Sequence, residues 1–281
     1  MIDPSPMADR IIRLALEEDL GAGDVTTTAI VDPDLRGEAY LIAREKLVLA
    51  GMPVFKRVIH ELGAETVFED YYKDGDLIPP DARVCLLKGR LAPILWGERT
   101  ALNFLQRMSG IATLTHQYVE RVKPARARIL DTRKTVPGLR WFDKYAVRMG
   151  GGSNHRFGLS DGILIKDNHI AAAGSISRAV RLAREYAPHT LKIEVEAEDL
   201  AGVEEACREG ADAILLDNMD PAQLAKAVEL IDGAAIIEAS GGITLDTVKG
   251  VADTGVNMIS VGALTHSAKA ADFSLEINPK L

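Results

Sequence analysis

The alternation of apolar and polar residues divides the chain into two parts of different character. In the first part, helical spacing predicts three helices, at 7–20, 53–62 and 93–122. Strand-like apolar runs predict two strands, at 37–50 and 82–95. Gly21-Ala22-Gly23 ends the first helix, and Ser109-Gly110 loosens the helical pattern of the last one. Because strands and helices do not alternate regularly here, the first part predicts an α+β domain.

From Ala127 onward, short apolar runs alternate with helical patterns. The predicted strands lie at 127–131, 162–167, 191–196, 213–218, 234–240 and 257–263. The predicted helices lie at 141–149, 175–187, 199–210, 222–230 and 244–255. Alternating units of this kind predict parallel strands that are buried on both faces. Polar or small residues end four successive strands about one βα unit apart, namely Glu196, Asp217, Ser240 and Gly262. This layout favours a (β/α) barrel, since an open sheet would gather its ligands at one switch point.

Composition narrows the class of protein. The chain has 281 residues, of which 47% are hydrophobic and 26% charged, as is ordinary for a soluble globular protein of one large or two ordinary domains. A net charge of −8 and a pI near 5.4 argue against general binding to nucleic acid or to a membrane surface. Cys85 and Cys207 lack metal-ligand spacing, and no apolar run suggests a signal peptide or a membrane span. We therefore expect a cytoplasmic protein.

One segment departs from this acidic composition, and we call residues 131–169 the basic segment. Between Arg133 and Ser160 it holds six lysines or arginines against one acid, Asp143. A basic island within an acidic protein indicates a specific pocket for a small, highly charged anion, because a polyanion would need a broader basic surface.

Three places in the basic segment are candidates for anion binding. Arg133 and Lys134 follow a predicted strand, and the guanidinium fork suits a carboxylate. His155-Arg156 follow three glycines, which permit close approach of the backbone to a ligand. Lys166 ends an apolar run where an unpaired ammonium would be costly, so we expect a charged partner. Ordinary salt bridges, including one between Lys166 and Asp167, are the alternative interpretation.

Acidic residues and glycines end the later strands. Glu194 and Glu196 alternate with apolar residues and therefore point to one face of their strand, where carboxylates require cations. With Asp217 they fit a Mg²⁺–phosphate substrate, and structural pairing with lysines is the alternative. Ser240-Gly241-Gly242 and Val261-Gly262 are turns whose backbone amides suit a phosphate. The sequence thus predicts a carboxylate-rich ligand and a metal-bound phosphate in one cleft.

Several motifs resemble those of the quinolinate phosphoribosyltransferases, the carboxylating nicotinate-nucleotide pyrophosphorylases. They are DTRKTVPGLR, KYAVRMGGGSNHRFGLSDGILIKDNH, LLDNM, EASGGITLDTV, LEEDLGAGDVTT and GERTALNFLQRMSGIATLT, and together they cover nearly the whole chain. The resemblance implies an N-terminal α/β sandwich domain over 1–108 and an irregular, incomplete α/β barrel over 109–270, the type II phosphoribosyltransferase arrangement, with 271–281 returning to the first domain. It also implies a homodimer with shared active sites and leaves a hexamer open.

The resemblance further implies that quinolinate and phosphoribosyl pyrophosphate (PRPP) give nicotinate mononucleotide, carbon dioxide and pyrophosphate, with Mg²⁺. It places Arg133, His155, Arg156 and Lys166 around quinolinate, Lys134 between the substrates and Arg99 in the neighbouring subunit's site. It assigns the ribose hydroxyls and the metal to Glu196 and Asp217, and phosphate to Ser240, Gly241, Gly242, Val261 and Gly262. The catalytic residues would be Lys134, Lys166, Glu196 and Asp217. A phosphoribosyltransferase for nicotinate and an oxyanion-binding paralogue linked to molybdate transport remain alternatives.

Overall fold

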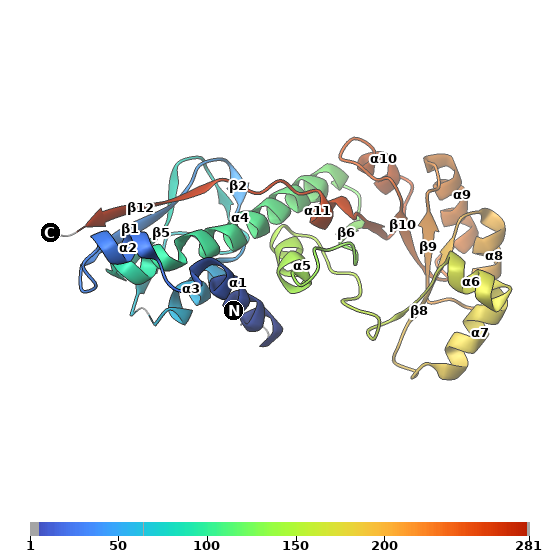
Figure 1. Cartoon of the computed structure of the whole chain (residues 1–281). Helices are drawn as coiled ribbons and strands as arrows, with labels where there is room; N and C mark the ends of the chain where they lie inside the picture. The colour runs from blue at the N-terminus through green and yellow to red at the C-terminus, as the bar shows by residue number, and fades with distance from the viewer. Residues whose placement is uncertain (1–5, 64, 280–281) are drawn as a thin grey trace. The chain divides into compact units, whose positions relative to one another are not determined.

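The computed structural model describes residues 6–63 and 65–279, and they form two compact units (Figure 1). The first unit comprises the chain up to His116, Thr135–Gly151 and the chain from Thr265 onward. The second unit comprises Gln117–Lys134 and Gly152–Leu264. Within the described ranges, none of the helices has both the length and the apolar character needed to span a membrane.

The first unit contains a four-stranded antiparallel sheet in the order β12-β1-β5-β3. Its strands are β1 (Arg36–Ala43), β3 (Val67–Asp70), β5 (Ala82–Arg90) and β12 (Phe273–Pro279). β12 pairs with β1 from Gly37 to Ala43, so the end of the chain completes the sheet that the first strand begins. Ala39, Leu41 and Ala43 are 0% exposed, which places one face of β1 in the core.

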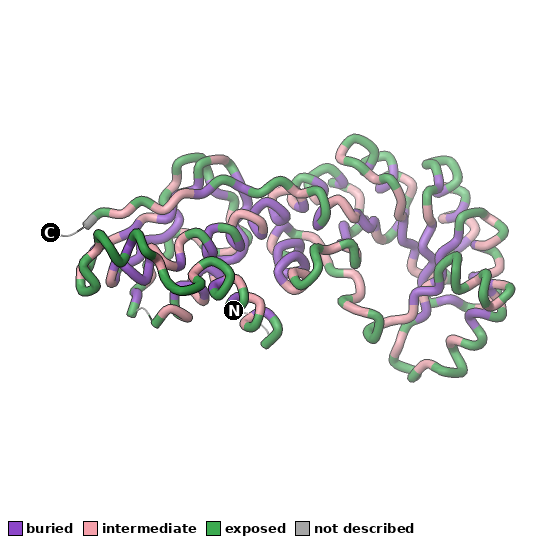
Figure 2. Tube along the Cα trace, in the orientation of Figure 1, coloured by how far each residue is buried: buried purple, intermediate pink, exposed green. Residues whose placement is uncertain are grey.

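Helices pack against this sheet and complete the first unit. Figure 2 shows buried residues on both the helices and the strands of this unit. The remaining elements are α1 (Pro6–Leu20), α2 (Val25–Ile30), α3 (Met52–Glu61), α5 (Arg140–Met149), and the two-residue strands β2 (Leu47–Val48) and β4 (Leu77–Ile78). The predicted strand at 82–95 is wrong beyond Arg90, because the long helix α4 (Leu91–Val122) begins at the next residue. Residues 91–94 of this run are buried in the helix, and periodicity alone cannot separate a buried strand from a buried helix.

α4 is not loosened at Ser109-Gly110, contrary to the sequence prediction. The Ser109 hydroxyl donates to the Ala50 carbonyl and accepts from the Ala50 amide, both at 3.1 Å. A Cβ on Gly110 would lie 2.0 Å from the Lys269 carbonyl oxygen. Small residues are therefore present because other segments pack closely against the helix there, and not because the helix breaks.

The one acid of the basic segment between Arg133 and Ser160 is part of the first unit's core. Asp143 is 0% exposed, and both of its carboxylate oxygens accept hydrogen bonds from Arg107 at 2.8 Å. Arg107 also donates to the Thr265 carbonyl at 3.1 Å. Asp143 is thus committed to a buried ion pair with a residue outside the basic segment.

The second unit is built on six parallel strands in the order β6-β11-β10-β9-β8-β7. They are β6 (Arg128–Leu130), β7 (Ile163–Ile165), β8 (Ile193–Ala197), β9 (Ala213–Asp217), β10 (Ile236–Ser240) and β11 (Met258–Ser260). The helices are α6 (Asp167–Ala173), α7 (Ile176–Tyr186), α8 (Leu200–Arg208), α9 (Pro221–Ile231), α10 (Val248–Ala252) and α11 (Ala263–His266), the last of which runs into the first unit. Within the described residues no strand ladder joins β6 to β7, so the predicted incomplete barrel is confirmed.

Candidate active site

The polar strand ends predicted from the sequence gather at one edge of the barrel sheet. Ser240 at the end of β10 lies level with Asp217 at the end of β9. Glu196, one residue before the end of β8, lies level with Leu215 of β9. Because parallel strands present their carboxyl ends on the same side, these side chains surround one region.

One part of this region combines carboxylates with lysines. Lys166 follows β7, and its Nζ forms an ion pair with Glu196, which is 7% exposed. Burial raises the pKa of Asp217, the charge of Glu196 raises it further, and Lys166 and Lys134 oppose this shift. The expected charged partner of Lys166 is therefore Glu196, and the alternative pairing with Asp167 is wrong, because the Lys166 ammonium lies against Glu196.

A second part of the region contains two arginines. Arg133 is exposed in the segment after β6, and Arg156 donates from Nη1 to the Gly162 carbonyl at 2.9 Å. Partial burial lowers the pKa of the Arg156 guanidinium, and the positive charge of Arg133 lowers it further. Glu194 and Asp161 oppose this shift only in part, so two mutually repelling guanidiniums form a site suited to an anion.

Asp131 fixes the segment that carries Arg156. It is 0% exposed at the end of β6, and it accepts the His155 amide at 2.9 Å and the Asn154 side-chain amide at 2.5 Å. The sequence interpretation did not single out Asp131. Its position at the end of a buried strand, the criterion applied to Asp217, could have identified it.

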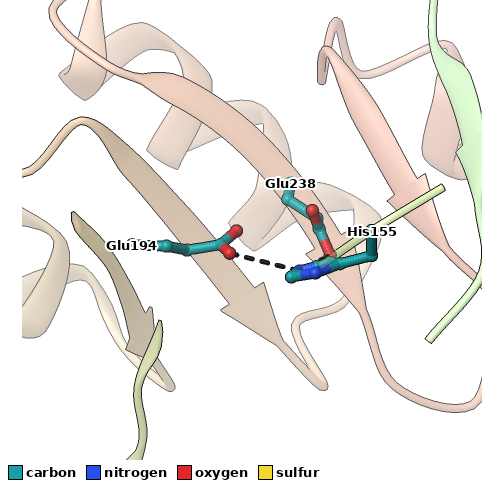
Figure 3. Close-up of side chains that lie close together, drawn as sticks. All are labelled: His155, Glu194 and Glu238. Carbon is teal, nitrogen blue, oxygen red and sulfur yellow. Dashed lines mark ion pairs between the residues drawn. The ribbon is translucent and has the colours of Figure 1, made fainter. Parts of the chain in front are cut away.

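The His155 ring points toward two glutamates, and we call these three residues the inner cluster (Figure 3). His155 Nε2 lies 3.2 Å from Glu194 Oε2 on β8 and 3.6 Å from Glu238 Oε1 on β10. The cluster lines a cavity of about 210 Å³ together with Ala213 and other residues of the strands. Glu238 was also missed from the sequence, although it alternates with apolar residues in the strand IIEAS as Glu194 does in its own.

The glycine turns at the ends of β10 and β11 differ in what they offer a phosphate. Gly241 and Gly242 both have positive φ, at 97° and 58°, and a Cβ on Gly241 would lie 2.2 Å from Asn218 Oδ1. The backbone therefore passes close to Asn218 as only glycine allows. The Val261 amide donates to the Leu130 carbonyl at 2.9 Å, so it serves the sheet, and the adjacent Gly262 is half-buried.

Arg99 belongs to a different part of the molecule from the other candidates. It is exposed on α4 in the first unit, whereas the remaining predicted site residues lie in the second unit.

Comparison with known proteins places this geometry in a family. Residues 24–109 match the sequence model of the quinolinate phosphoribosyl transferase N-terminal domain, and residues 111–276 match that of the C-terminal domain. A probable nicotinate-nucleotide pyrophosphorylase (carboxylating) of Bacillus subtilis is 45% identical over 260 residues, which are 92% of this chain and 90% of that protein. The chloroplastic enzyme of that name from Arabidopsis thaliana is 43% identical over 290 residues, 96% of this chain and 83% of that protein.

Solved structures agree with these sequence matches. The crystal structure of NadC from Streptococcus pyogenes superposes with a TM-score of 0.96 and 45% identity over 100% of both chains. Human nicotinic acid phosphoribosyltransferase, at 13% identity and a TM-score of 0.64 over 99% of this chain and 75% of that one, shares the fold alone. With two domain models covering most of its length and relatives above 40% identity, the chain belongs to the quinolinate phosphoribosyltransferase family.

Proposed function

We propose that this chain transfers the phosphoribosyl group of PRPP to quinolinate with decarboxylation, forming nicotinate mononucleotide, carbon dioxide and pyrophosphate for NAD biosynthesis. The observation that carries the proposal is the division of the strand-end region into two charge environments. Arg133 and Arg156 form a basic part, and Glu196 and Asp217 form an acidic part whose charge two lysines offset. The first suits a dicarboxylate, and the second suits a metal-bound pyrophosphate with its ribose.

The basic part would orient the pyridine ring. Quinolinate carries two neighbouring carboxylates, and a guanidinium fork binds a carboxylate with defined geometry. The repulsion that lowers the pKa of Arg156 would be relieved by an anion between the two arginines. Nicotinate, with one carboxylate, would relieve less of it, which favours quinolinate over the monocarboxylate alternative.

The acidic part fits Mg²⁺ together with a phosphorylated sugar. Burial and the charge of Glu196 both raise the pKa of Asp217, so a divalent cation would stabilise the two carboxylates in their ionised forms. Mg²⁺, when bound, would neutralise charge on the departing pyrophosphate. An oxyanion-binding protein without catalysis would have little use for this pair. We assign the phosphate to Ser240, Gly241, Gly242, Val261 and Gly262, with the Val261 amide itself held by the sheet.

The chemistry follows from charge placement. Departure of pyrophosphate leaves positive charge on the ribose, which Glu196 and Asp217 would stabilise. Attack by the pyridine nitrogen makes the ring cationic, so the ring itself accepts the electrons released when the adjacent carboxylate leaves as carbon dioxide. The protein must exclude water at that step. Lys134 or Lys166 would then supply a proton to the ring carbon.

The active enzyme would be a cytoplasmic homodimer in which Arg99 completes the partner's site. Mixing inactive Arg99→Ala and Lys166→Ala chains should then restore part of the activity, because one site of the heterodimer is intact. Exchange of subunits without recovery would show that Arg99 serves its own chain.

Incubation with quinolinate, PRPP and Mg²⁺ tests the function itself. The expected products are nicotinate mononucleotide and carbon dioxide in equal amounts, and chelation of Mg²⁺ should stop their formation. Turnover of nicotinate with none of quinolinate would establish the monocarboxylate alternative. Tight binding of molybdate without turnover of either base would establish the oxyanion-binding alternative.

A further inference from the structure

The inner cluster of His155, Glu194 and Glu238 brings two carboxylates and an imidazole together in the interior of the barrel (Figure 3). The side chains of His155, Glu194 and Glu238 are 14%, 13% and 3% exposed. Glu238 Oε1 has no hydrogen-bond partner within the described residues. Two glutamates so placed raise the question of where the protons of the cluster reside.

The hydrogen bond that the His155 ring accepts indicates its tautomer. The Arg156 backbone amide donates to His155 Nδ1 at 2.6 Å, so Nδ1 presents its lone pair and carries no proton. The proton of the ring is therefore on Nε2, which faces Glu194 at 3.2 Å. The ring thus links the Glu194 carboxylate to the backbone of Arg156.

This tautomer argues against a metal ion in the cluster. The three side chains do offer ligand atoms within 4.8 Å of one another, a spacing that a transition metal could bridge. A metal at Nε2 would displace its proton, and the ring would then need to donate from Nδ1. Nδ1 instead accepts a hydrogen bond, which favours a proton at Nε2.

The surroundings of Glu238 favour its neutral form. Burial, followed by the charge of Glu194, raises the pKa of Glu238 to about 7, while a hydrogen bond with the Ser260 hydroxyl opposes the shift. From the neighbouring strands, Glu194 on β8 and Ser260 on β11 face it, and Ala213 and Leu215 of β9 bring no charge. Arg128 and Lys192 line the same cavity. A neutral Glu238 leaves the cluster with one negative charge instead of two.

The cluster contacts Arg156 through the His155 ring. The His155 ring holds the Arg156 amide from inside the barrel, and Asp131 holds the His155 amide from β6. The charge of Glu194 also reaches the Arg156 guanidinium, whose pKa it raises against the effects of burial and Arg133. A second unprotonated glutamate nearby would oppose the approach of a dianionic substrate.

We propose that Glu194 and Glu238 are positioning residues of the base site. Glu194 holds His155 as the Nε2–H tautomer, Glu238 borders the same ring from β10, and His155 in turn fixes Arg156 for the carboxylates of the substrate. The inference rests on the proposed function for the identity of that substrate. Neither glutamate touches the reacting atoms, so the effect should fall on the KM for quinolinate more than on that for PRPP.

Steady-state kinetics of the full-length enzyme between pH 6 and 8 provide the test. For the wild type we expect the KM for quinolinate to rise about tenfold from pH 6 to pH 8, as Glu238 loses its proton. Glu238→Gln, which mimics the neutral acid, should remove this rise. At pH 6, Glu194→Gln should raise the KM for quinolinate about tenfold, with the KM for PRPP within twofold of wild type. Glu229→Gln, which removes an exposed carboxylate on α9, is the matched control and should follow the wild type.

Unchanged pH dependence in Glu238→Gln, or equal changes in both KM values for Glu194→Gln, would overturn the proposal. A wild type that does not turn over quinolinate at all would instead refute the proposed function. The tautomer is tested without turnover by ¹⁵N spectra of histidine-labelled protein at pH 6.5, with His155→Asn identifying the signals. A protonated Nε2 and an unprotonated Nδ1 are expected. A doubly protonated ring, or Zn²⁺ binding at His155 that Glu238→Gln abolishes, would contradict the proposal.

Discussion

The turn after β10 allows the phosphate assignment to be tested by adding a single methyl group. In Gly241→Ala the new Cβ would lie 2.2 Å from Asn218 Oδ1 and 2.8 Å from the Asn218 backbone nitrogen. The amide side chain could rotate away. The backbone nitrogen could not, because it donates to the Ser240 carbonyl at 2.9 Å where β9 and β10 lie side by side. The turn itself must therefore move.

The cost has two parts. A non-glycine residue at φ 97° is strained by about 1–2 kcal/mol. Relief of the contact with the Asn218 backbone requires a displacement of roughly half an ångström, which shifts the amides assigned to the phosphate. We expect the KM for PRPP to rise at least tenfold, which corresponds to about 1.4 kcal/mol, with a smaller effect on quinolinate.

Substitutions at two other glycines of the second unit distinguish the effect of backbone strain from the effect of moving the turn. Gly242 has φ 58° but no atom within 4 Å of its Cβ position, so Gly242→Ala adds strain without a clash. Gly250 in α10 has neither problem, and Gly250→Ala should stabilise the fold by about 0.5–1 kcal/mol without altering KM. The assay measures KM for both substrates and unfolding by denaturant. A folded Gly241→Ala enzyme with the wild-type KM for PRPP would refute the reasoning.

Three further changes probe other parts of the chain. Arg133→Ala should weaken quinolinate binding by about 1.5–3 kcal/mol and PRPP binding by less, measured by titration calorimetry. Equal losses for the two substrates would contradict the assignment of Arg133 to the quinolinate site. Arg107→Ala leaves Asp143 buried without its ion pair, so denaturant unfolding should show a loss of about 3–5 kcal/mol. The pKa of Glu238 is higher in the folded state than its unfolded value near 4.5, so its contribution to stability is fully present below pH 4.5. This contribution is lost as pH rises through about 7. Glu238→Gln should therefore gain up to about 3 kcal/mol relative to wild type between pH 4.5 and 7.5 in pH-dependent unfolding, and a constant difference would contradict the assigned protonation.

The barrel was predictable from the sequence, and much of the first unit was not. Each strand of the second unit is a short buried run between helical patterns, so one local rule finds all six. In the first unit, β1 pairs with β12 more than 200 residues away, and such a pairing has no local signature. The apolar run after Arg90 fits either element, and its inclusion in α4 depends on packing that the sequence does not display.

Candidate site residues were found where a strand end marked them. Glu196, Asp217 and Ser240 follow that rule and lie together at one edge of the sheet. Asp131 follows it too, but its neighbours Arg133 and Lys134 offered the more obvious chemistry. Glu238 precedes its strand end by two residues, so it lies deeper in the barrel and escaped the rule.

Glu194 and Glu196 show why composition and alternation cannot assign roles within a barrel. Both point to the same face of β8, yet Glu194 lies level with Ala213 and Glu196 level with Leu215. This difference of two residues along the strand gives Glu196 the ammonium of Lys166 as its partner and gives Glu194 the imidazole of His155. Alternation specifies the face, but the partner depends on the level of the residue in the barrel and on segments that other strands bring to that level. We therefore propose different roles for two glutamates of one strand, metal binding for Glu196 and orientation of a histidine for Glu194.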